Sequence, residues 1–436
     1  MTAMMAMEAG LDRRALLRMG AAAGLGAAFL PRLAVAAEQP DMMVHVRELI
    51  ERWVGPGKFP GMIASLGLPG RETQYVARGS EGFTDADAIT QDSLFRIYSM
   101  TKPITGMAAM MLIDDGKLGL DQPLADILPK FSNMQVQVTP DGSLTDLRPA
   151  KAPITMRHLL THTAGLAYSI IQKGPIKAAM EEKGLISGRI SRLNIPGIFR
   201  APSVNSLEKF ADGMADLPLV YEPGTKWSYS TGLDVMGRVI EVVSGKSFDV
   251  FLKENVFDPA GMGSTWFQVP KSEAGRLTTN YAVFAGKLVP IDNGADSIFL
   301  DPPAFPFGGS GLVSSPRDYD RFLAMLANLG EIDGTRVMGE LAVRVGTGNL
   351  LPEGVDGPQI MAPQSEFGAG GRVGMGPEAG VFGWAGAAGT VGMVDMRHGL
   401  RSSIFVQFMP PDALELLPDF QQALKADIMA LMARQS

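Results

Sequence analysis

A serine and a lysine stand three residues apart at the start of an apolar stretch, in the segment "RIYSMTKPITGMAAMML". Pro103 follows Lys102 directly, and proline fits an α-helix only within its first turn. The sequence therefore predicts a helix that begins near Ser99 and ends at Gly116, where a left-handed residue can terminate it. Residues three apart on a helix lie on the same side. The spacing thus brings the Ser99 hydroxyl and the Lys102 amine together without help from another element.

This pair has a chemical interpretation and a purely structural one. A serine at a helix N-terminus has an unspent backbone N–H that can bind an oxyanion. A lysine beside it can act as a base only where burial or a neighbouring cation favours the neutral amine, and Met100, Ile104 and Met107 can supply such burial. The same spacing also describes a helix-capping serine with a solvated lysine, so the pattern alone does not establish catalysis.

The first 36 residues are predicted to be an export signal rather than part of the fold. The pair Arg13–Arg14 precedes a short apolar run, and small residues stand at Ala34 and Ala36. This plan resembles a twin-arginine signal and predicts export to the periplasm; a disordered or amphipathic leader is the alternative. The apolar run is too short to span a bilayer of roughly 30 Å, so no stable membrane anchor is expected.

Charge and cysteine content exclude several other classes of protein. The net charge is −7 and no basic run follows the leader, so nucleic acid is not an expected partner. The absence of cysteine excludes disulfides, thiolate metal sites, a lipid-anchored cysteine and a cysteine nucleophile.

Strand patterns near both ends of the chain enclose a mainly helical middle. With 46% apolar residues the chain can bury a large core. We therefore predict an α+β fold in which an antiparallel sheet is flanked by N- and C-terminal helices. The predicted sheet domain comprises residues 37–95 and 300–436, and a mainly helical domain, residues 96–299, is inserted into it.

Five segments, in order, resemble the serine β-lactamase and penicillin-binding-protein-like hydrolases. They are "LFRIYSMTKPITGMAAMMLIDDGKLGLDQPLADILP", "PITMRHLLTHTAGL", "YEPGTKWSYSTGLDVMGRVIEVVSGKS", "GGSGLVSSPRDYDRF" and "WAGAAG". The resemblance covers most of the chain from about residue 44, and the motifs are most similar to those of family VIII carboxylesterases. It implies a β-lactamase/transpeptidase-like fold with Ser99 as the acyl-accepting nucleophile.

The resemblance also implies roles for Tyr229 and Ala387. In this family a tyrosine motif follows the S-x-x-K, and Tyr229 in "WSYSTG" stands in its place. A phenol opposite Lys102 makes chemical sense, because the two groups can share the proton that Ser99 loses and return it to the leaving group. By resemblance, the backbone N–H of Ala387 is the second oxyanion donor beside that of Ser99.

Two departures from the family pattern bear on the substrate. Lactam-cleaving members usually have asparagine two residues after the tyrosine, where this chain has Thr231, and a K-T-G-type triplet where it has Trp384-Ala385-Gly386. Trp384 offers an apolar face and one N–H instead of a cation, and a lost charge-assisted contact costs roughly 1.5–3 kcal/mol. These positions, with Tyr168, are the predicted substrate-binding residues.

Other catalytic machinery has little support. No G-x-S-x-G motif is present, which excludes the nucleophile elbow of α/β-hydrolases. His158 and His162 have the i, i+4 spacing of a helical metal pair, but the glutamate of H-E-x-x-H is missing. We therefore expect no metal and no organic cofactor.

The sequence as a whole predicts a serine carboxylesterase that acts on small-molecule esters with small to medium acyl chains. A β-lactamase, a D-amino-acid peptidase or a transacylase of the same fold is the alternative within enzymes. A binding protein that kept the fold without the chemistry is the alternative outside them. The sequence makes no prediction about the oligomeric state.

Overall fold

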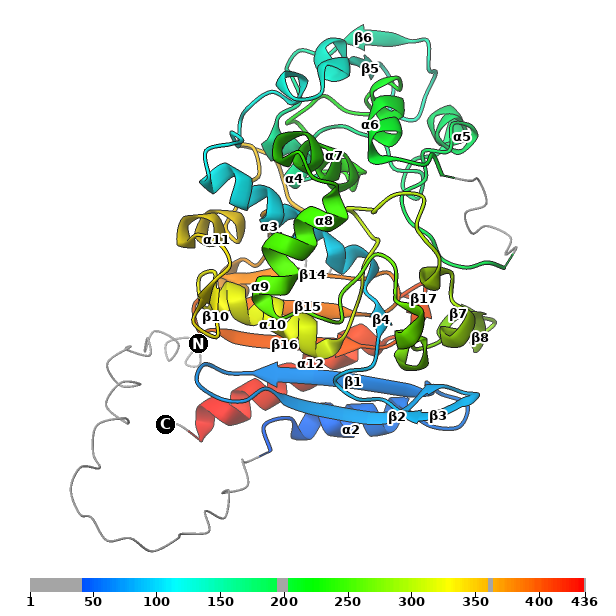
Figure 1. Ribbon diagram of the computed structural model, residues 1–436, viewed down its shortest axis with the longest axis vertical. Helices are drawn as coiled ribbons and strands as arrows, with labels where there is room; N and C mark the ends of the chain where they lie inside the picture. Colours follow the sequence, from blue (N-terminus) through cyan, green and yellow to red (C-terminus); the bar gives the residue numbers. More distant parts are fainter. Residues whose placement is uncertain (1–40, 194–202, 360–363, 435–436) are drawn as a thin grey trace, which may run out of the picture. The chain divides into compact units, whose positions relative to one another are not determined.

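Eight strands from the two ends of the chain form one antiparallel sheet, in the order β12-β13-β14-β15-β16-β1-β2-β3 (Figure 1). The structure, a computed structural model, describes residues 41–193, 203–359 and 364–434. The N-terminal β1 pairs directly with the C-terminal β16, so the sheet forms only when both ends of the chain are in place. The strands are β1 Gly61–Gly67, β2 Gln74–Gly82, β3 Asp85–Ala88, β12 Glu366–Phe367, β13 Arg372–Val373, β14 Val381–Ala385, β15 Val391–Asp395 and β16 Leu400–Phe405.

Alternation along β1 gives the sheet two buried faces. Met62, Ala64 and Leu66 belong to a core shared with helices α2 (Val44–Trp53) and α12 (Leu416–Ala433). Ile63 points to the opposite face, where α10 (Pro316–Ala327) and the main core lie. The predicted arrangement of a sheet flanked by terminal helices is therefore confirmed. Because successive side chains of a strand point to opposite faces, β1 contributes residues to the core on each side of the sheet.

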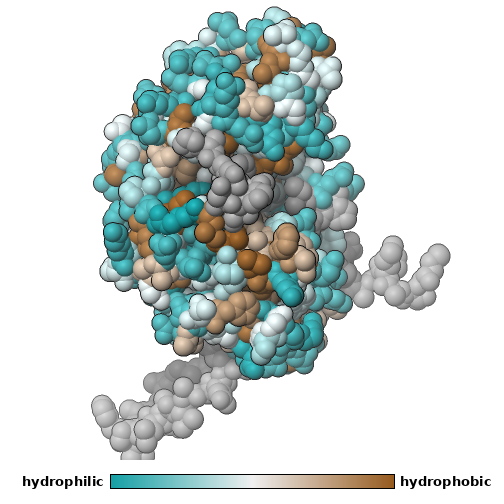
Figure 2. Space-filling model, turned by 90° about the vertical axis from the view of Figure 1, so that its right-hand side faces the viewer, coloured by the Kyte–Doolittle hydropathy of each residue, from teal (hydrophilic) through white to brown (hydrophobic). Residues whose placement is uncertain are grey.

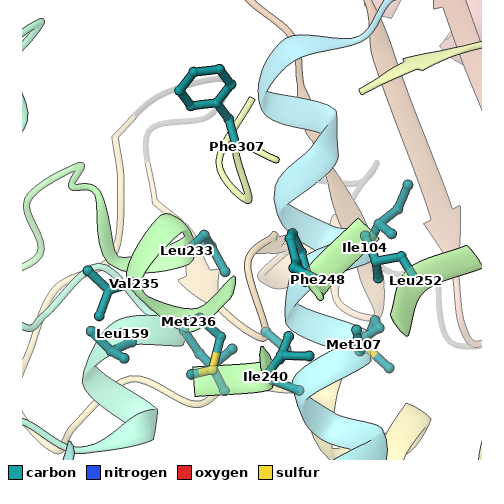
Figure 3. Close-up of a cluster of buried hydrophobic side chains, with 14 of the residues drawn as sticks. Ile104, Met107, Leu159, Leu233, Val235, Met236, Ile240, Phe248, Leu252 and Phe307 are labelled. Atoms are coloured by element: carbon teal, nitrogen blue, oxygen red, sulfur yellow. The ribbon is translucent and has the colours of Figure 1, made fainter. Parts of the chain in front are cut away.

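The main core lies among the helices, around α3. Figure 3 shows Ile104 and Met107 of α3 (Thr101–Asp114) near Leu252, and Leu233, Met236 and Ile240 along α7 (Gly232–Ser244). The spacing of the three α7 residues is that of an amphipathic helix face, and Gly245 ends α7 in a left-handed conformation. The helices outside the sheet layer are α3 Thr101–Asp114, α4 Met156–Leu160, α5 Gly174–Glu182, α6 Leu207–Ala215, α7 Gly232–Ser244, α8 Phe248–Leu252, α9 Asp258–Ala260 and α11 Glu340–Gly346.

Short strand pairs connect the helical region to the sheet. The largest of these small sheets has the order β17-β7-β8, and in it the C-terminal β17 runs parallel to β7. The remaining pairs are two-stranded and antiparallel. These strands are β4 Phe95–Arg96, β5 Gln135–Gln137, β6 Leu147–Pro149, β7 Asn280–Phe284, β8 Lys287–Asp292, β9 Val313–Ser314, β10 Glu331–Ile332, β11 Thr335–Arg336 and β17 Phe408–Met409.

Two predictions about the organisation of the chain remain predictions. The export signal over residues 1–36 lies outside the described residues. From Met42 to Ser436 the chain clusters as one compact unit, so the predicted boundaries at 95/96 and 299/300 are not tested.

In the described ranges, no helix combines the length and hydrophobicity needed to cross a bilayer. The face in Figure 2 mixes hydrophilic and hydrophobic residues, with hydrophobic ones more frequent near its centre.

A buried carboxylate at the end of β2 makes stability depend on pH. Glu81 is 4% exposed, one of its oxygens accepts the Ser93 hydroxyl at 2.7 Å, and the other has no partner among the described residues. Burial raises the pKa of Glu81 from 4.5 to about 7, and Asp85 and Asp87 add to this effect. The folded protein therefore holds this proton more tightly than the unfolded chain does.

Replacing this acid by its neutral isostere is expected to stabilise the protein only above pH 4.5. The contribution of Glu81 is fully present below pH 4.5 and is lost as the pH rises through about 7. Glu81→Gln should match the parent protein at pH 4 and exceed it in free energy of unfolding by about 1–2 kcal/mol at pH 8. Urea unfolding at both pH values measures this difference, and an equal effect at the two values would contradict it.

Candidate active site

Ser99 lies in a 3₁₀ turn, Tyr98–Met100, immediately before α3. The predicted α-helix therefore begins two residues after Ser99, at Thr101, and the serine sits at its mouth. Tyr98 has a φ of 40°, a conformation that costs a non-glycine residue of order 1–3 kcal/mol. Its buried side chain is held by a hydrogen bond from Asn280 and by an edge contact with Phe299. These contacts fix the backbone that presents Ser99.

Three functional groups meet at the Ser99 hydroxyl. Lys102 Nζ donates to Ser99 Oγ at 3.1 Å, and Tyr229 Oη donates to the same oxygen at 2.7 Å. Lys102 Nζ also lies 4.5 Å from the centroid of the Tyr229 ring. Ser99 and Tyr229 are half-buried, whereas Lys102 is 1% exposed. The structure therefore brings together the three residues that the sequence proposes as catalytic, and only the lysine is withdrawn from solvent.

The end of β14 adds a further contact to this group. Trp384 Nε1 donates to Tyr229 Oη at 3.2 Å, so the phenol oxygen accepts an N–H while it donates to Ser99. A Cβ at Gly386 would lie 2.4 Å from the carbonyl oxygen of Ile97, so this turn approaches the Ser99 segment as closely as only glycine allows. Ala385 ends the strand opposite Val391.

The two predicted oxyanion donors have unspent N–H groups. Within the described part of the chain, the backbone N–H groups of Ser99 and Ala387 donate no hydrogen bond to another protein group. The turn that carries Ala387 is closed by a bond from the Gly386 N–H to the Thr390 carbonyl. Both amides are thus available to an acceptor that is not part of the protein.

Aromatic rings surround the phenol of Tyr229. The ring centroids of His162, Tyr168, Trp384 and Trp227 lie 4.8, 5.7, 5.9 and 6.1 Å from that of Tyr229. Burial, reinforced by the charge of Lys102, lowers the pKa of His162 well below 6.5, so this imidazole is neutral. The surroundings of the phenol are therefore apolar and aromatic, apart from Lys102.

Thr231 differs from the other predicted substrate-binding residues. It is fully buried, and its hydroxyl donates to the Ala167 carbonyl at 3.1 Å. Its hydroxyl is thus occupied by a structural contact, whereas Trp384 and Tyr168 lie against the catalytic tyrosine candidate.

The two histidines with i, i+4 spacing do not form a helical pair. Helix α4 ends at Leu160, and His162 follows it with a φ of 57°, so the two side chains do not share a helix face. His158 Nδ1 accepts the Thr155 N–H in a capping box, while His162 Nδ1 pairs with the Ser230 hydroxyl. Over the described residues, no group of three potential metal ligands is present.

A buried carboxylate near the site was missed by the sequence analysis. Asp234, in the first turn of α7, is 2% exposed and accepts the Gly309 N–H, and the Gly309 carbonyl accepts Lys102. The one local signal was an aspartate in an otherwise apolar helix start, "GLDVM". Its partners are far away in the sequence, so no periodicity could have revealed them.

The fold and the Ser99–Lys102–Tyr229 cluster together define a protein of the serine β-lactamase and penicillin-binding-protein-like class. Among solved structures, EstCE1, described as a hydrolase with promiscuous acyltransferase activity, superimposes with a TM-score of 0.70 at 24% identity. That match covers 88% of this chain and 98% of EstCE1. At this identity the likeness establishes the fold alone. The Beta-lactamase family model matches residues 46–426, and the chain belongs to this family.

Curated relatives include esterases. Protein Rv1367c of Mycobacterium tuberculosis is 34% identical over 61% of this chain and 62% of its own length. Esterase EstB of Burkholderia gladioli is 30% identical over 63% of this chain and 68% of EstB. The lovastatin esterase of Penicillium rubens is 28% identical over 86% of this chain and 95% of that enzyme. The chain thus spans about six-tenths of the length of the first curated relatives it matches.

Proposed function

We propose that this protein is a serine carboxylesterase that cleaves small to medium acyl esters through an acyl-enzyme on Ser99. The observation that carries the proposal is the joint contact of Lys102 and Tyr229 with the Ser99 hydroxyl, at 3.1 and 2.7 Å. A hydroxyl becomes a nucleophile when a base within hydrogen-bond distance can take its proton. No metal or organic cofactor is needed for this chemistry.

The reaction follows from the positions of these groups. The Lys102–Tyr229 pair acts in its ammonium–phenolate form: Ser99 Oγ attacks the ester carbonyl as its proton passes to Tyr229 Oη, and the Ser99 and Ala387 N–H groups stabilise the oxyanion. The pair returns the proton to the departing alcohol, and water then cleaves the acyl-enzyme by the same steps. Lys102 Nζ lies against the face of the Tyr229 ring and Trp384 Nε1 donates to the phenol oxygen, which supports a role for Tyr229 in the proton transfer.

An uncharged substrate fits this site better than a β-lactam. The strand position where lactam-cleaving relatives carry a lysine holds Trp384, whose only polar group is directed to Tyr229. Tyr168 and Trp227 present further aromatic surface around the phenol. The names of Esterase EstB and the lovastatin esterase agree with an ester as the substrate.

The test compares two chromogenic substrates on the same preparation. The expected kcat/KM for p-nitrophenyl butyrate exceeds that for nitrocefin by about 100-fold, because a missing charge-assisted contact is worth roughly 1.5–3 kcal/mol. Both activities should disappear in Ser99→Ala. Efficient nitrocefin hydrolysis with negligible esterase activity would instead make the protein a β-lactamase.

Transfer of the acyl group to an alcohol is a second candidate activity. Relatives include the acyltransferase CalJ of Penicillium decumbens, 32% identical over 61% of this chain and 59% of CalJ. An acyl-enzyme in an apolar site can react with an alcohol as well as with water. Adding a short alcohol and measuring the ratio of new ester to free acid distinguishes a transferase from a hydrolase.

If the leader acts as an export signal, the proposed esterase acts in the periplasm.

A further inference from the structure

The Lys102 ammonium is buried without a direct anionic partner. Its Nζ contacts the Gly309 carbonyl at 2.6 Å, the Ser99 hydroxyl and the face of Tyr229, and it forms no ion pair with any described carboxylate. Burying an isolated ammonium is costly unless hydrogen bonds or opposite charge compensate for its lost hydration. The strongest acceptor it has is a single backbone carbonyl.

The residue that supplies this carbonyl, Gly309, is also held by Asp234 through its N–H, which belongs to the preceding peptide group. Asp234 Oδ1 accepts the Gly309 N–H at 3.0 Å, and its Oδ2 accepts the Ser187 hydroxyl at 2.6 Å. A Cβ at Gly309 would lie 2.8 Å from Oδ2, so the backbone approaches the carboxylate as closely as only glycine permits. The Gly309 backbone thus contacts both the Asp234 carboxylate and the Lys102 ammonium, and the ammonium contacts the Ser99 hydroxyl.

The carboxylate acts on the ammonium through space. A low-dielectric interior strengthens the attraction between opposite charges that are not in direct contact. Burial raises the pKa of Asp234, while the Ser187 hydroxyl, the Gly309 N–H and the charge of Lys102 all oppose that rise. Asp234 and Lys102 therefore interact electrostatically although they share no direct hydrogen bond.

We propose that Asp234 is a positioning residue: its carboxylate anchors the Gly309 backbone and supplies, through space, the opposing charge that keeps the Lys102 ammonium directed at Ser99 and Tyr229. This inference rests on the proposed serine chemistry and adds a fourth side chain to it. Asp234 touches no reacting atom and acts through Lys102. Its charge therefore affects the rate of the chemical step rather than substrate binding.

Asp234→Asn tests the role of the charge, because asparagine keeps an oxygen for the Gly309 N–H. The expected result is a kcat for p-nitrophenyl butyrate that falls about 10- to 100-fold, with KM changed by less than about threefold. If this variant does not fold, Asp234→Ser removes the same charge and should give the same separation of kcat from KM.

Asp318→Asn is the matched control. Asp318 is also a buried aspartate in the first turn of a helix, and it likewise accepts one backbone N–H, from Ser264, and the hydroxyl of Thr265. The Asp318→Asn variant should lose about as much stability as Asp234→Asn but keep the parent kcat. A kcat within threefold of the parent in folded Asp234→Asn, or an equal loss of kcat in Asp318→Asn, would overturn the proposal.

Failure of this inference can be told apart from failure of the proposed function. If the parent protein hydrolyses the ester and Ser99→Ala does not, the function stands whatever Asp234→Asn does. If the parent protein shows no Ser99-dependent turnover, the proposed function fails, and the positioning role fails with it.

Discussion

Ser99→Ala is expected to lower kcat for p-nitrophenyl butyrate by about 10⁴-fold or more, the largest effect of any single substitution in this chain. Removing the hydroxyl removes the atom that forms the acyl-enzyme, and nucleophile deletions in serine hydrolases cause losses of this order. The same variant should no longer be labelled by a fluorophosphonate, which reacts with an activated serine. Both steady-state kinetics and labelling measure the effect.

A serine remote from the site provides the control for this result. Ser132 is exposed and lies in a 3₁₀ turn, Pro129–Asn133, so Ser132→Ala should keep the parent rate and the parent labelling. The stability of Ser99→Ala should change little, because the hydroxyl is half-buried and its loss leaves no large cavity. Residual esterase activity above one-hundredth of the parent value would identify another nucleophile.

Lys102→Met and Tyr229→Phe are each expected to lower kcat by about 10²–10⁴-fold, the range that a general acid–base group contributes. The double variant should be no more than about threefold worse than the worse single variant. The reason is that both groups act on one proton at one oxygen, Ser99 Oγ, and groups that act as a unit are strongly non-additive. Measuring kcat for the three variants completes the cycle.

Tyr281→Phe is the control for the loss of a phenol. Its hydroxyl accepts the Phe83 N–H in the small sheet near β2, so its removal should affect stability but not kcat. Circular dichroism of Lys102→Met checks that this buried site still folds without its cation. Losses that simply multiply in the double variant would mean that the two residues act in separate steps.

The sequence predicted those parts of the fold in which local pattern and tertiary packing agree. Strand patterns near both ends of the chain located the sheet, and Gly116, left-handed with a φ of 69°, follows the end of the helix after Ser99. The three residues at the nucleophile were found because Ser99 and Lys102 are close in sequence and a family motif supplied Tyr229. Their contacts in the structure fit that prediction, while their catalytic roles remain the proposal above.

What the sequence could not predict depends on contacts between distant segments. The left-handed backbone at Tyr98 and His162 is imposed by surrounding packing, so Ser99 lies in a 3₁₀ turn before the α-helix and the histidine pair does not share a helix. The contact of Asp234 with Gly309 joins residues 75 positions apart. Such contacts carry no periodic signal, because they arise only when two elements meet in the folded chain.

The central claim is that an acyl group passes through Ser99. Intact-mass analysis of the protein a few milliseconds to seconds after mixing with p-nitrophenyl butyrate tests it most directly. Acylation of Ser99 should give a transient species heavier by one butyryl group, with the added mass on the peptide that contains Ser99. Tyr229→Phe should form this species more slowly. Rapid release of p-nitrophenol with no added mass at any time, or with the mass on another residue, would contradict an acyl-enzyme on Ser99.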